Sequence, residues 1–314
     1  MTELRIGAPN EKQRRFLLDR HRHIAYGGAR GGGKSWAVRT KAKLLALRYA
    51  GIRILLVRRS LAELEANHLA FLRQELADVA EYRAGERQFR FCNGSVLQFG
   101  YCGCDRDLDR YQGAEYDVIF LDEATQMKEQ WMRQIAACVR GVNDFPKRIY
   151  YTCNPGGPGH GYIKRLFIDR RFEDGEQPED YAFIPARVTD NAALLARQPD
   201  YLKTLEALPY KLRRAWLEGR WDVFAGQVFQ EFTDDPDHYD DRRWTHVIRP
   251  FDVPREWNIY RSYDFGYARP FSCGWWAVDH DGCVYRIAEL YGCTGTPDEG
   301  VLWTPERQFA EIRR

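Results

Sequence analysis

Short apolar runs alternate with helical patterns along the first half of the chain. HIAYGG (residues 23–28), RILLVRR (53–59) and VIFL (118–121) are largely apolar, as is typical of strands that are buried on both faces of a parallel sheet. The first two runs are followed by segments with the 3.6-residue period of amphipathic helices. This alternation predicts an α/β domain with a parallel sheet, and we assign it to residues 1–153.

The pattern changes in the second half. Residues 154–225 begin with the turn-rich NPGGPGHG and continue in short helical pieces, which predicts a small helical subdomain. Residues 226–256 contain the acidic stretch DDPDHYDDRR and are interpreted as a linker. Residues 257–314 alternate apolar and polar positions around Asp281 and Gly282, a turn signal that predicts antiparallel strands.

Composition limits the class of protein. The 314 residues are 44% hydrophobic, enough for two domains with their own cores. A formal net charge of +2 gives no global basic field of the kind that points to nucleic acid. No apolar run approaches the roughly 18 residues of a membrane span, and the charged N-terminus has no signal core. The eight cysteines include no CxxC pair, so we expect a soluble intracellular protein with reduced thiols and no membrane partner.

Glycines are concentrated between the first predicted strand and the first predicted helix. The stretch GARGGGKS satisfies the pattern G-x-x-x-x-G-K-[ST] in the structural context that this pattern requires. Bare backbone N–H groups in such a loop form an anion nest at a helix N-terminus. We expect Lys34 to reach the β- and γ-phosphates of a nucleotide and Ser35 to bind Mg²⁺; a serine-capped glycine turn is the alternative. The expected nucleotide contacts are Gly28, Arg30, Gly31, Gly32, Gly33, Lys34 and Ser35.

Two acids follow the run VIFL. Asp122 fits the carboxylate that holds Mg²⁺ opposite Ser35, and Glu123 fits the residue that polarises the attacking water. A helix N-terminus stabilised by two acids is the simpler interpretation. With the phosphate loop, and without an NKxD-type base-reading element, the pair favours ATP hydrolysis coupled to motion. A P-loop nucleotide-dependent kinase and an ATP-binding conformational switch stay open as alternatives.

Several blocks in a fixed order resemble the large terminase subunit of tailed bacteriophages, the motor and nuclease that packages viral DNA. Besides the phosphate loop they are PNEKQRRFL, VRRSLAELEAN, DRYQGAEYDVIFLDEA, YYTCNPGG, LEGRWDVFAGQVF and SYDFGYARP. The resemblance covers nearly the whole chain. It implies an α/β P-loop NTPase with an ASCE-type parallel sheet and flanking helices, then a small helical subdomain and the first part of an RNase H-like nuclease domain.

The resemblance also implies cofactors and partners. The cofactors are ATP and Mg²⁺. The partners are double-stranded DNA, a portal protein ring and a small terminase subunit, with a homo-oligomeric ring on the portal in the host cell cytoplasm.

Site residues are carried over from the family position by position. Gln13 is similar to the glutamine that reads the adenine edge, and Arg110 to the arginine finger offered to a neighbouring subunit's ATP. Arg30, inside the phosphate loop, is the competing finger and would act in cis. Thr152 and Asn154 are similar to the coupling motif that senses the γ-phosphate. For each of these positions an ordinary surface or strand-end residue is the alternative.

The segment SYDFGYARP resembles the first strand of an RNase H-like nuclease, with Asp264 as its first metal-binding carboxylate. Two-metal cleavage needs several acids around ions about 3.5–4 Å apart. Asp279 and Asp281 flank a turn and are more typical of turn formers, and Glu289 does not match the family's second acid. The remaining acids would fall beyond Arg314, so we expect a truncated nuclease domain with little or no activity; a complete site would bind Mg²⁺ or Mn²⁺.

Local basic clusters occur at residues 58–59, 170–171, 211–214 and 241–243. Each is either a solvated face or a contact to DNA. A packaging motor needs a grip on the phosphate backbone without sequence readout, because it must move along any sequence.

Overall fold

The computed structural model describes residues 6–222, 232, 234–243, 245–295 and 299–314. It divides into two compact units, Met1–Val247 and Ile248–Arg314, and each is described by itself. Part of the predicted linker, namely residues 226–231, 233 and 244, lies outside the described residues, as do residues 223–225 of the predicted helical subdomain. In the described ranges, no helix has both the length and the apolar character needed to cross a membrane.

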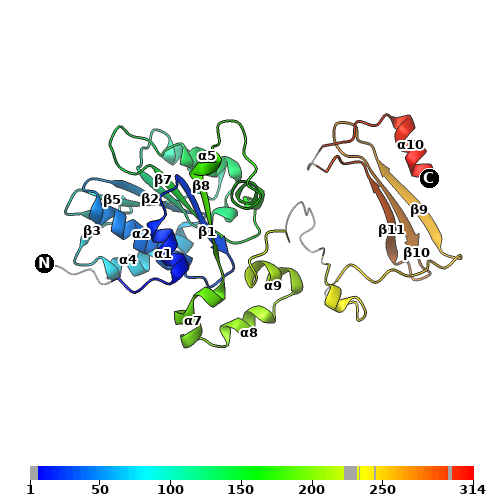
Figure 1. The fold of residues 1–314 in the computed structure, drawn as a ribbon, viewed down its shortest axis with the longest axis horizontal. Coiled ribbons are helices and arrows are strands. Elements are labelled where there is room, and N and C mark those ends of the chain that lie inside the picture. Colours follow the sequence, from blue (N-terminus) through cyan, green and yellow to red (C-terminus); the bar gives the residue numbers. More distant parts are fainter. Residues whose placement is uncertain (1–5, 223–231, 233, 244, 296–298) are drawn as a thin grey trace. The chain divides into compact units, whose positions relative to one another are not determined.

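The first unit contains an eight-stranded sheet and short helices (Figure 1). The strands are β1 His23–Gly28, β2 Arg53–Arg58, β3 Ala80–Arg83, β4 Gln88–Phe91, β5 Val96–Tyr101, β6 Val118–Leu121, β7 Arg148–Cys153 and β8 Tyr181–Ala186. The α-helices are α1 Glu11–Leu18, α2 Lys34–Arg48, α3 Leu61–Leu64, α4 Ala70–Glu75, α5 Glu129–Ala136, α6 His160–Ile163, α7 Ala192–Arg197, α8 Tyr201–Glu206 and α9 Tyr210–Trp216. The π-helical turns are η1 Glu65–Leu69 and η4 Lys164–Ile168. The 3-10 turns are η2 Asp105–Tyr111, η3 Ala124–Gln126, η5 Pro178–Asp180, η6 Val188–Asp190 and η7 Pro236–His238.

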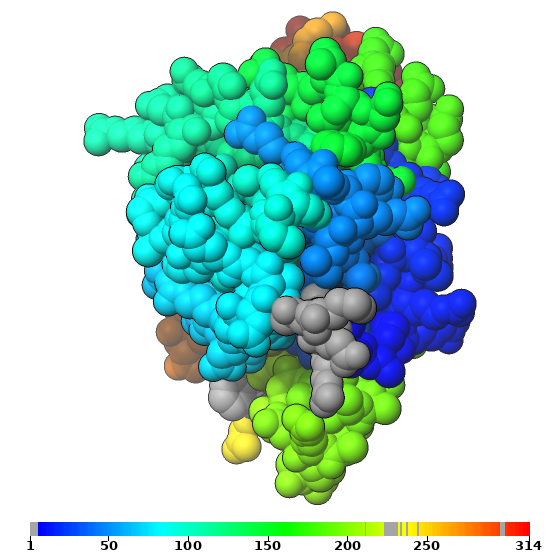
Figure 2. Space-filling model, turned by 90° about the vertical axis from the view of Figure 1, so that its left-hand side faces the viewer, coloured from blue at the N-terminus to red at the C-terminus, as the bar shows by residue number. Residues whose placement is uncertain are grey.

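The strand order is β3-β4-β5-β2-β6-β7-β1-β8. Neighbours from β5 to β8 are parallel, whereas β3 and β4 form an antiparallel edge. This edge, cyan in Figure 2, lies beside the blue segments that come before it in the chain. Strand β7 separates β1 from β6, so one strand lies between the strand before the phosphate loop and the strand before the two acids. The predicted parallel α/β fold is confirmed.

Side chains at alternate positions of the strands pack into two cores on opposite faces of the sheet. On β1, Ile24 and Tyr26 belong to the core that α1, α2 and α4 cover. Ala25 between them belongs to the core under α5 and α6. Both faces are therefore buried between helices, and Figure 1 shows the resulting three layers. This double burial explains why the strands appear in the sequence as continuous apolar runs.

The ends of four parallel strands define the position of the candidate site. The strands β1, β2, β6 and β7 run in the same direction, so their carboxyl ends lie together at one end of the strands, here called the carboxyl end of the sheet. The glycine loop follows β1, the two acids follow β6, and Asn154 follows β7. Ligand sites of open parallel sheets lie at the carboxyl ends of the strands.

The second unit is a small antiparallel sheet with one helix. Its strands are β9 Asn258–Asp264, β10 Ser272–Val278 and β11 Val284–Tyr291, in the order β11-β10-β9, and its helix is α10 Pro305–Arg313. The predicted turn at Asp281 and Gly282 connects β10 to β11, and Gly282 has a φ of +79°. Gln308 of α10 donates a hydrogen bond to the Gly266 carbonyl at 2.7 Å.

Candidate functional site

Three side chains hold three consecutive carbonyl groups of the glycine loop. Asn191, Tyr26 and Gln13 donate hydrogen bonds to the carbonyls of residues 31, 32 and 33, at 2.7, 2.9 and 3.1 Å. In a planar peptide the next N–H points away from the preceding carbonyl. The N–H groups of residues 32–34 therefore point away from these three side chains, and none donates to a backbone carbonyl of the described residues. The loop is thus shaped as an anion nest.

Three glycines of the stretch GARGGGKS have backbones that favour glycine, and the first, Gly28, has a φ of +122°. Gly31 and Gly33 have φ angles of +79° and +76°, in the left-handed region where a Cβ atom is strained. A Cβ on Gly33 would lie 2.3 Å from Nε2 of Gln13. The left-handed conformation therefore favours glycine at both positions, and a Cβ on Gly33 would also displace the Gln13 amide from the loop carbonyl.

Lys34 begins α2 and is almost fully buried. Its Nζ donates to the Ala29 carbonyl at 2.8 Å and to Oδ1 of Asn154 at 2.7 Å. Burial lowers the pKa of the Lys34 ammonium, although the nearby Glu123 carboxylate partly offsets this effect. The ammonium group therefore lies within the site, where an anionic ligand would compensate its burial.

The loop opens into a cavity of about 570 Å³, a size typical of ligand sites. The lining residues come from the loop, from the ends of β2, β6 and β7, and from α3 and α8. They are Arg30, Gly31, Gly32, Gly33, Lys34, Ser35, Trp36, Arg58, Arg59, Glu63, Glu123, Gln126, Asn154 and Tyr201. The fold thus brings the predicted phosphate loop and the predicted catalytic acid to one hollow.

Asp122 is fixed by side chains from three different elements. Its Oδ2 lies 2.8 Å from Nε2 of His68 and 3.5 Å from Nη1 of Arg58. Its Oδ1 accepts a hydrogen bond from the Thr152 hydroxyl at 2.6 Å. Burial alone would raise the pKa of Asp122, but His68, Arg58 and Thr152 together hold that pKa well below its usual value. Asp122 is therefore an oriented carboxylate that stays ionised.

Glu123 has a left-handed backbone, with a φ of +52°. Its N–H donates to the Thr152 hydroxyl oxygen at 2.9 Å. The amide of Asn154 donates to both Glu123 carboxylate oxygens, at 2.8 and 3.1 Å. A non-glycine residue in this region costs free energy, and such strained residues cluster at functional sites. Thr152 and Asn154, predicted from the β7 end, are therefore in direct contact with the two acids.

The other predicted nucleotide contacts occupy different surroundings. Gln13 is buried, and both ends of its amide are engaged: Oε1 accepts from the Asn10 N–H at 2.9 Å and Nε2 donates to the loop. Arg30 lies in the cavity wall with its guanidinium 3.3 Å from the ring centre of Trp216 in α9. Its N–H donates to the Trp216 carbonyl at 2.8 Å. The phosphate loop is thus attached to the helical region of the chain.

Arg110 lies away from the lining of this cavity. It belongs to η2, forms an ion pair with Asp107 at 3.2 Å and lies 4.2 Å from the ring centre of Tyr101. Its side chain is about half exposed. This placement is compatible with a contact to another molecule, and its role as a finger stays a prediction.

Asp264, the predicted nuclease ligand, is the last residue of β9 and is exposed. It pairs in register with Ser272 of β10. In the described residues, no group of three or more His, Cys, Asp or Glu side chains is placed to hold a metal ion. Its role as a metal ligand stays a prediction.

Two residues around Asp122 are not assigned to the site by the sequence. Arg58 is part of a basic cluster and of the block VRRSLAELEAN, but neither gives it a role at the site, and His68 belongs to no motif. The sequence signal for Arg58 is its place in the apolar run RILLVRR. The structure shows that it ends β2, which is next to β6, and that the Asp122 N–H donates to the Val57 carbonyl at 2.9 Å. His68 gives no comparable signal, because it lies within an ordinary helical pattern.

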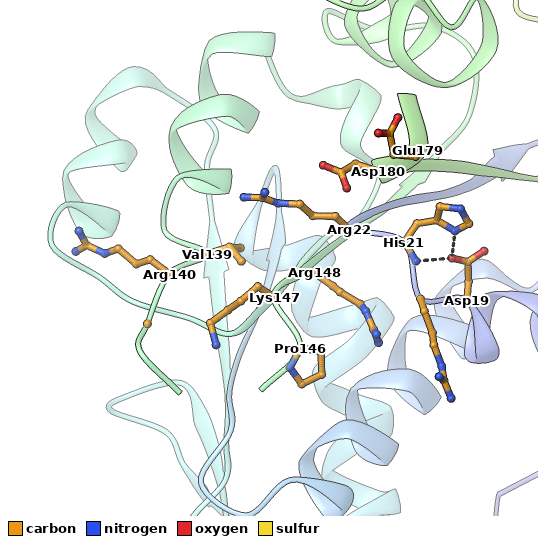
Figure 3. A pocket seen from close by; sticks show the side chains of 12 residues that line it. Asp19, His21, Arg22, Val139, Arg140, Pro146, Lys147, Arg148, Glu179 and Asp180 are labelled. Atoms are coloured by element: carbon orange, nitrogen blue, oxygen red, sulfur yellow. Dashed lines mark hydrogen bonds and ion pairs between the residues drawn. The ribbon is translucent and has the colours of Figure 1, made fainter. Parts of the chain in front are cut away.

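A larger hollow, of about 970 Å³, lies at the amino ends of the parallel strands, opposite the glycine loop (Figure 3). It is lined by residues 19–22 before β1, 139–141 after α5, 146–148 at the start of β7 and 179–180 before β8. Arg22, Lys147 and Arg148 are mixed there with Glu179 and Asp180. Both linings mix basic and acidic side chains, but the glycine loop with its free N–H groups lines only the smaller of these two cavities, which is therefore the candidate for an anionic ligand.

Comparison with known proteins agrees with this architecture. Residues 25–233 match the family described as terminase large subunit, T4likevirus-type, N-terminal. The large terminase of a thermophilic bacteriophage, in complex with ADP, is 17% identical, with a TM-score of 0.56 over 96% of this chain and 72% of that chain. The same thermophilic phage protein in complex with ATP-gamma-S is 16% identical, with a TM-score of 0.54 and the same coverage.

A mutant of the large terminase ATPase domain from Thermus phage P74-26 is 16% identical, with a TM-score of 0.51 over 68% of this chain and 94% of that chain. No curated protein matches the chain. At these identities the structural matches show a shared fold.

Proposed function

The chain belongs to the large terminase subunits of the T4likevirus type, and we propose that it is an ATP-hydrolysing motor subunit that translocates double-stranded viral DNA into a procapsid. One observation carries the proposal. The anion nest, Lys34 and Glu123 line one cavity, with Asp122 fixed directly before Glu123. ADP and ATP-gamma-S are present in structures of the large terminase from the thermophilic bacteriophage, which has the same fold.

The residues of the chain have distinct roles in this proposal. The N–H groups of the loop and the Lys34 ammonium bind the β- and γ-phosphates. Glu123 orients the attacking water and accepts its proton. Thr152 and Asn154 sense the γ-phosphate, because Asn154 contacts both Lys34 and Glu123. Gln13 is proposed to read adenine, which requires its amide to leave Asn10 or the loop.

The donor set fits Mg²⁺. Ser35 offers a hydroxyl and Asp122 an ionised carboxylate, and Mg²⁺ prefers such oxygen ligands alongside water and substrate phosphates. When bound, Mg²⁺ neutralises charge that develops on the phosphates. The oriented Asp122 carboxylate supports this assignment.

An arginine completes the proposed site. We favour Arg110 of an adjacent subunit, since its guanidinium is half exposed and outside its own cavity lining. Arg30 is the alternative in cis, since it lines the cavity while its guanidinium is stacked on Trp216. A finger of this kind is worth about 10³–10⁵ in rate.

The assembly is proposed from the family. It comprises a homo-oligomeric ring on the portal protein, a small terminase subunit and double-stranded DNA in the host cytoplasm. Residues 257–314 are proposed as part of an RNase H-like nuclease domain, with Asp264 as a metal ligand.

ATP turnover with and without linear duplex DNA tests the proposal. We expect turnover that DNA stimulates, and a loss of at least about 100-fold in Lys34→Ala. Lys203→Ala is the matched control, because Lys203 is exposed and pairs only with Asp200 in the described residues. Undiminished turnover in Lys34→Ala would refute the assigned site. Transfer of phosphate to an acceptor, without an effect of DNA, would support a kinase instead.

A further inference from the structure

His68 is a buried histidine in contact with the proposed metal ligand. Its side chain has no exposed surface, and that of Asp122 is 2% exposed. Nε2 of His68 lies 2.8 Å from Oδ2 of Asp122. An ionised carboxylate can only accept hydrogen bonds, so Nε2 must carry the hydrogen. The imidazole therefore donates to Asp122 in a buried environment, where such bonds are strong.

The local backbone directs this side chain toward β6. His68 lies in the π-helical turn η1, between α3 and α4, and the Ala70 N–H donates to the Glu65 carbonyl, five residues earlier. The helical segment still places Leu69 and Leu72 in the hydrophobic core. A single π turn in an α-helix changes the direction of its side chains and is frequent at functional sites.

The three side chains that fix Asp122 differ in their other contacts. Arg58 also pairs with Glu63 at 3.4 Å, and Thr152 also accepts the Glu123 N–H. Nε of Arg58 and Nδ1 of His68 are both buried without a hydrogen-bond partner among the described residues, but the Arg58 guanidinium has the ion pair with Glu63, whereas the ring of His68 bonds only to Asp122 in that part of the chain. A buried polar atom without a partner costs free energy that an apolar side chain would avoid. The hydrogen bond to Asp122 therefore accounts for a histidine at this position despite the cost.

We propose that His68 is a positioning residue that orients the Asp122 carboxylate for Mg²⁺ bound with the nucleotide. The inference rests on the proposed function, since it requires Asp122 to be the metal ligand. Hydrogen-bond partners of metal ligands fix the orientation of the ligand, and their loss costs about 10- to 100-fold in metal affinity or activity. His68 acts through Asp122 and has no direct role in the chemistry.

Two substitutions separate positioning from packing. His68→Phe keeps a ring of similar size but removes the donor, whereas His68→Gln keeps a donor at about the reach of Nε2. Leu72→Val is the control for a packing change in the same helical segment, because Leu72 lies in the core and its side chain has no polar atom that could bond to Asp122. All variants are made in the full chain.

Two quantities are measured for each variant. One is the affinity for a fluorescent ADP analogue in EDTA and at increasing Mg²⁺. The other is the Mg²⁺ concentration that gives half-maximal ATP turnover. For His68→Phe we expect affinity in EDTA within about twofold of wild type, a Mg²⁺ requirement raised about 10- to 100-fold, and recovery of most of this loss in His68→Gln.

The outcomes are distinguishable. An unchanged Mg²⁺ requirement in His68→Phe would overturn the inference, and so would an equal loss of affinity in EDTA and in Mg²⁺ accompanied by a fall in Tm like that of Leu72→Val. Wild-type protein without Mg²⁺-dependent turnover would overturn the proposed function itself, and the inference with it.

Discussion

The side-chain amide of Asn154 donates hydrogen bonds to both carboxylate oxygens of Glu123, at 2.8 and 3.1 Å. The oxygen of the same amide accepts from Nζ of Lys34 at 2.7 Å. One amide thus links the proposed phosphate-binding lysine to the proposed water-orienting acid. A γ-phosphate that binds the Lys34 ammonium would break its hydrogen bond to the Asn154 amide oxygen. The amide could then reorient, which would change its hydrogen bonds to Glu123.

The first prediction concerns Glu123. Glu123→Gln keeps the size of the side chain but removes the proton acceptor, so nucleotide binding should stay within about threefold while turnover falls about 10²- to 10⁴-fold. Binding of a fluorescent ADP analogue and release of phosphate measure the two effects. The control is Glu129→Gln, since Glu129 is an exposed acid of α5 paired with Arg133, and it should match wild type. Wild-type turnover in Glu123→Gln would remove Glu123 from its role.

The second prediction tests the Asn154 link. Asn154→Asp replaces the donor to Glu123 with a like charge, which is unfavourable at this separation. It also gives Lys34 an anionic partner that competes with the phosphates. We expect nucleotide affinity to fall about 10-fold or more, which a titration with the fluorescent analogue measures. Asn143→Asp, in an exposed loop, is the matched control. Equal affinity in wild type and Asn154→Asp would mean that Lys34 does not depend on this amide.

The sequence predicts the fold where local signals and burial agree. The run VIFL is apolar at every position because both faces of β6 are covered. The helix after the glycine loop forms as predicted, but it is not amphipathic, because Arg39, Lys41 and Lys43 are buried along with its apolar residues. The order of strands is harder to obtain. That β7 lies between β1 and β6 depends on packing of helices on both faces, and no local pattern encodes it; the ASCE-type sheet is implied by the family resemblance alone.

The candidate site divides in the same way. The glycine loop and the acids at 122 and 123 are contiguous motifs whose chemistry is legible in the sequence. The residues that shape them are not contiguous. Asn191 is 160 positions from the loop carbonyl that it holds, and His68 is 54 positions from Asp122. Only the folded chain brings such pairs together, so sequence patterns could not identify them.

A third prediction concerns acid stability. His23 stacks on Tyr181 with ring centres 4.5 Å apart. Burial, reinforced by the positive charge of Arg22, lowers the pKa of His23 from 6.5 to about 4. Between these two pH values His23 is protonated in the unfolded chain but not in the folded chain. The free energy of unfolding therefore falls as the pH drops from about 6.5 toward 4. The loss between pH 7 and pH 5 should be on the order of 1–2 kcal/mol.

Urea unfolding at several pH values measures this effect. In His23→Phe the slope of stability against pH over this window should be reduced, because the titrating group is absent. An identical slope in His23→Phe and wild type would assign the acid sensitivity to other groups.

The last prediction concerns the strand that leads into the phosphate loop. Gly27 of β1 pairs with Cys153 of β7, and a Cβ at this position would lie 2.3 Å from Sγ and 2.4 Å from the carbonyl oxygen of Cys153. Backbone cannot move aside as a flexible side chain can, so Gly27→Ala should destabilise the protein by about 1–3 kcal/mol or more.

Gly85 provides the matched control. A Cβ there meets nothing within 4 Å, so Gly85→Ala should leave the free energy of unfolding unchanged or raise it by about 0.4–1 kcal/mol through the unfolded chain. Urea unfolding of both variants gives the comparison. Because Gly27 directly precedes the loop, its substitution should also weaken nucleotide binding, whereas Gly85→Ala should not. Equal stability of the two variants would show that β1 and β7 can separate at Gly27 without cost, contrary to the close contact described here.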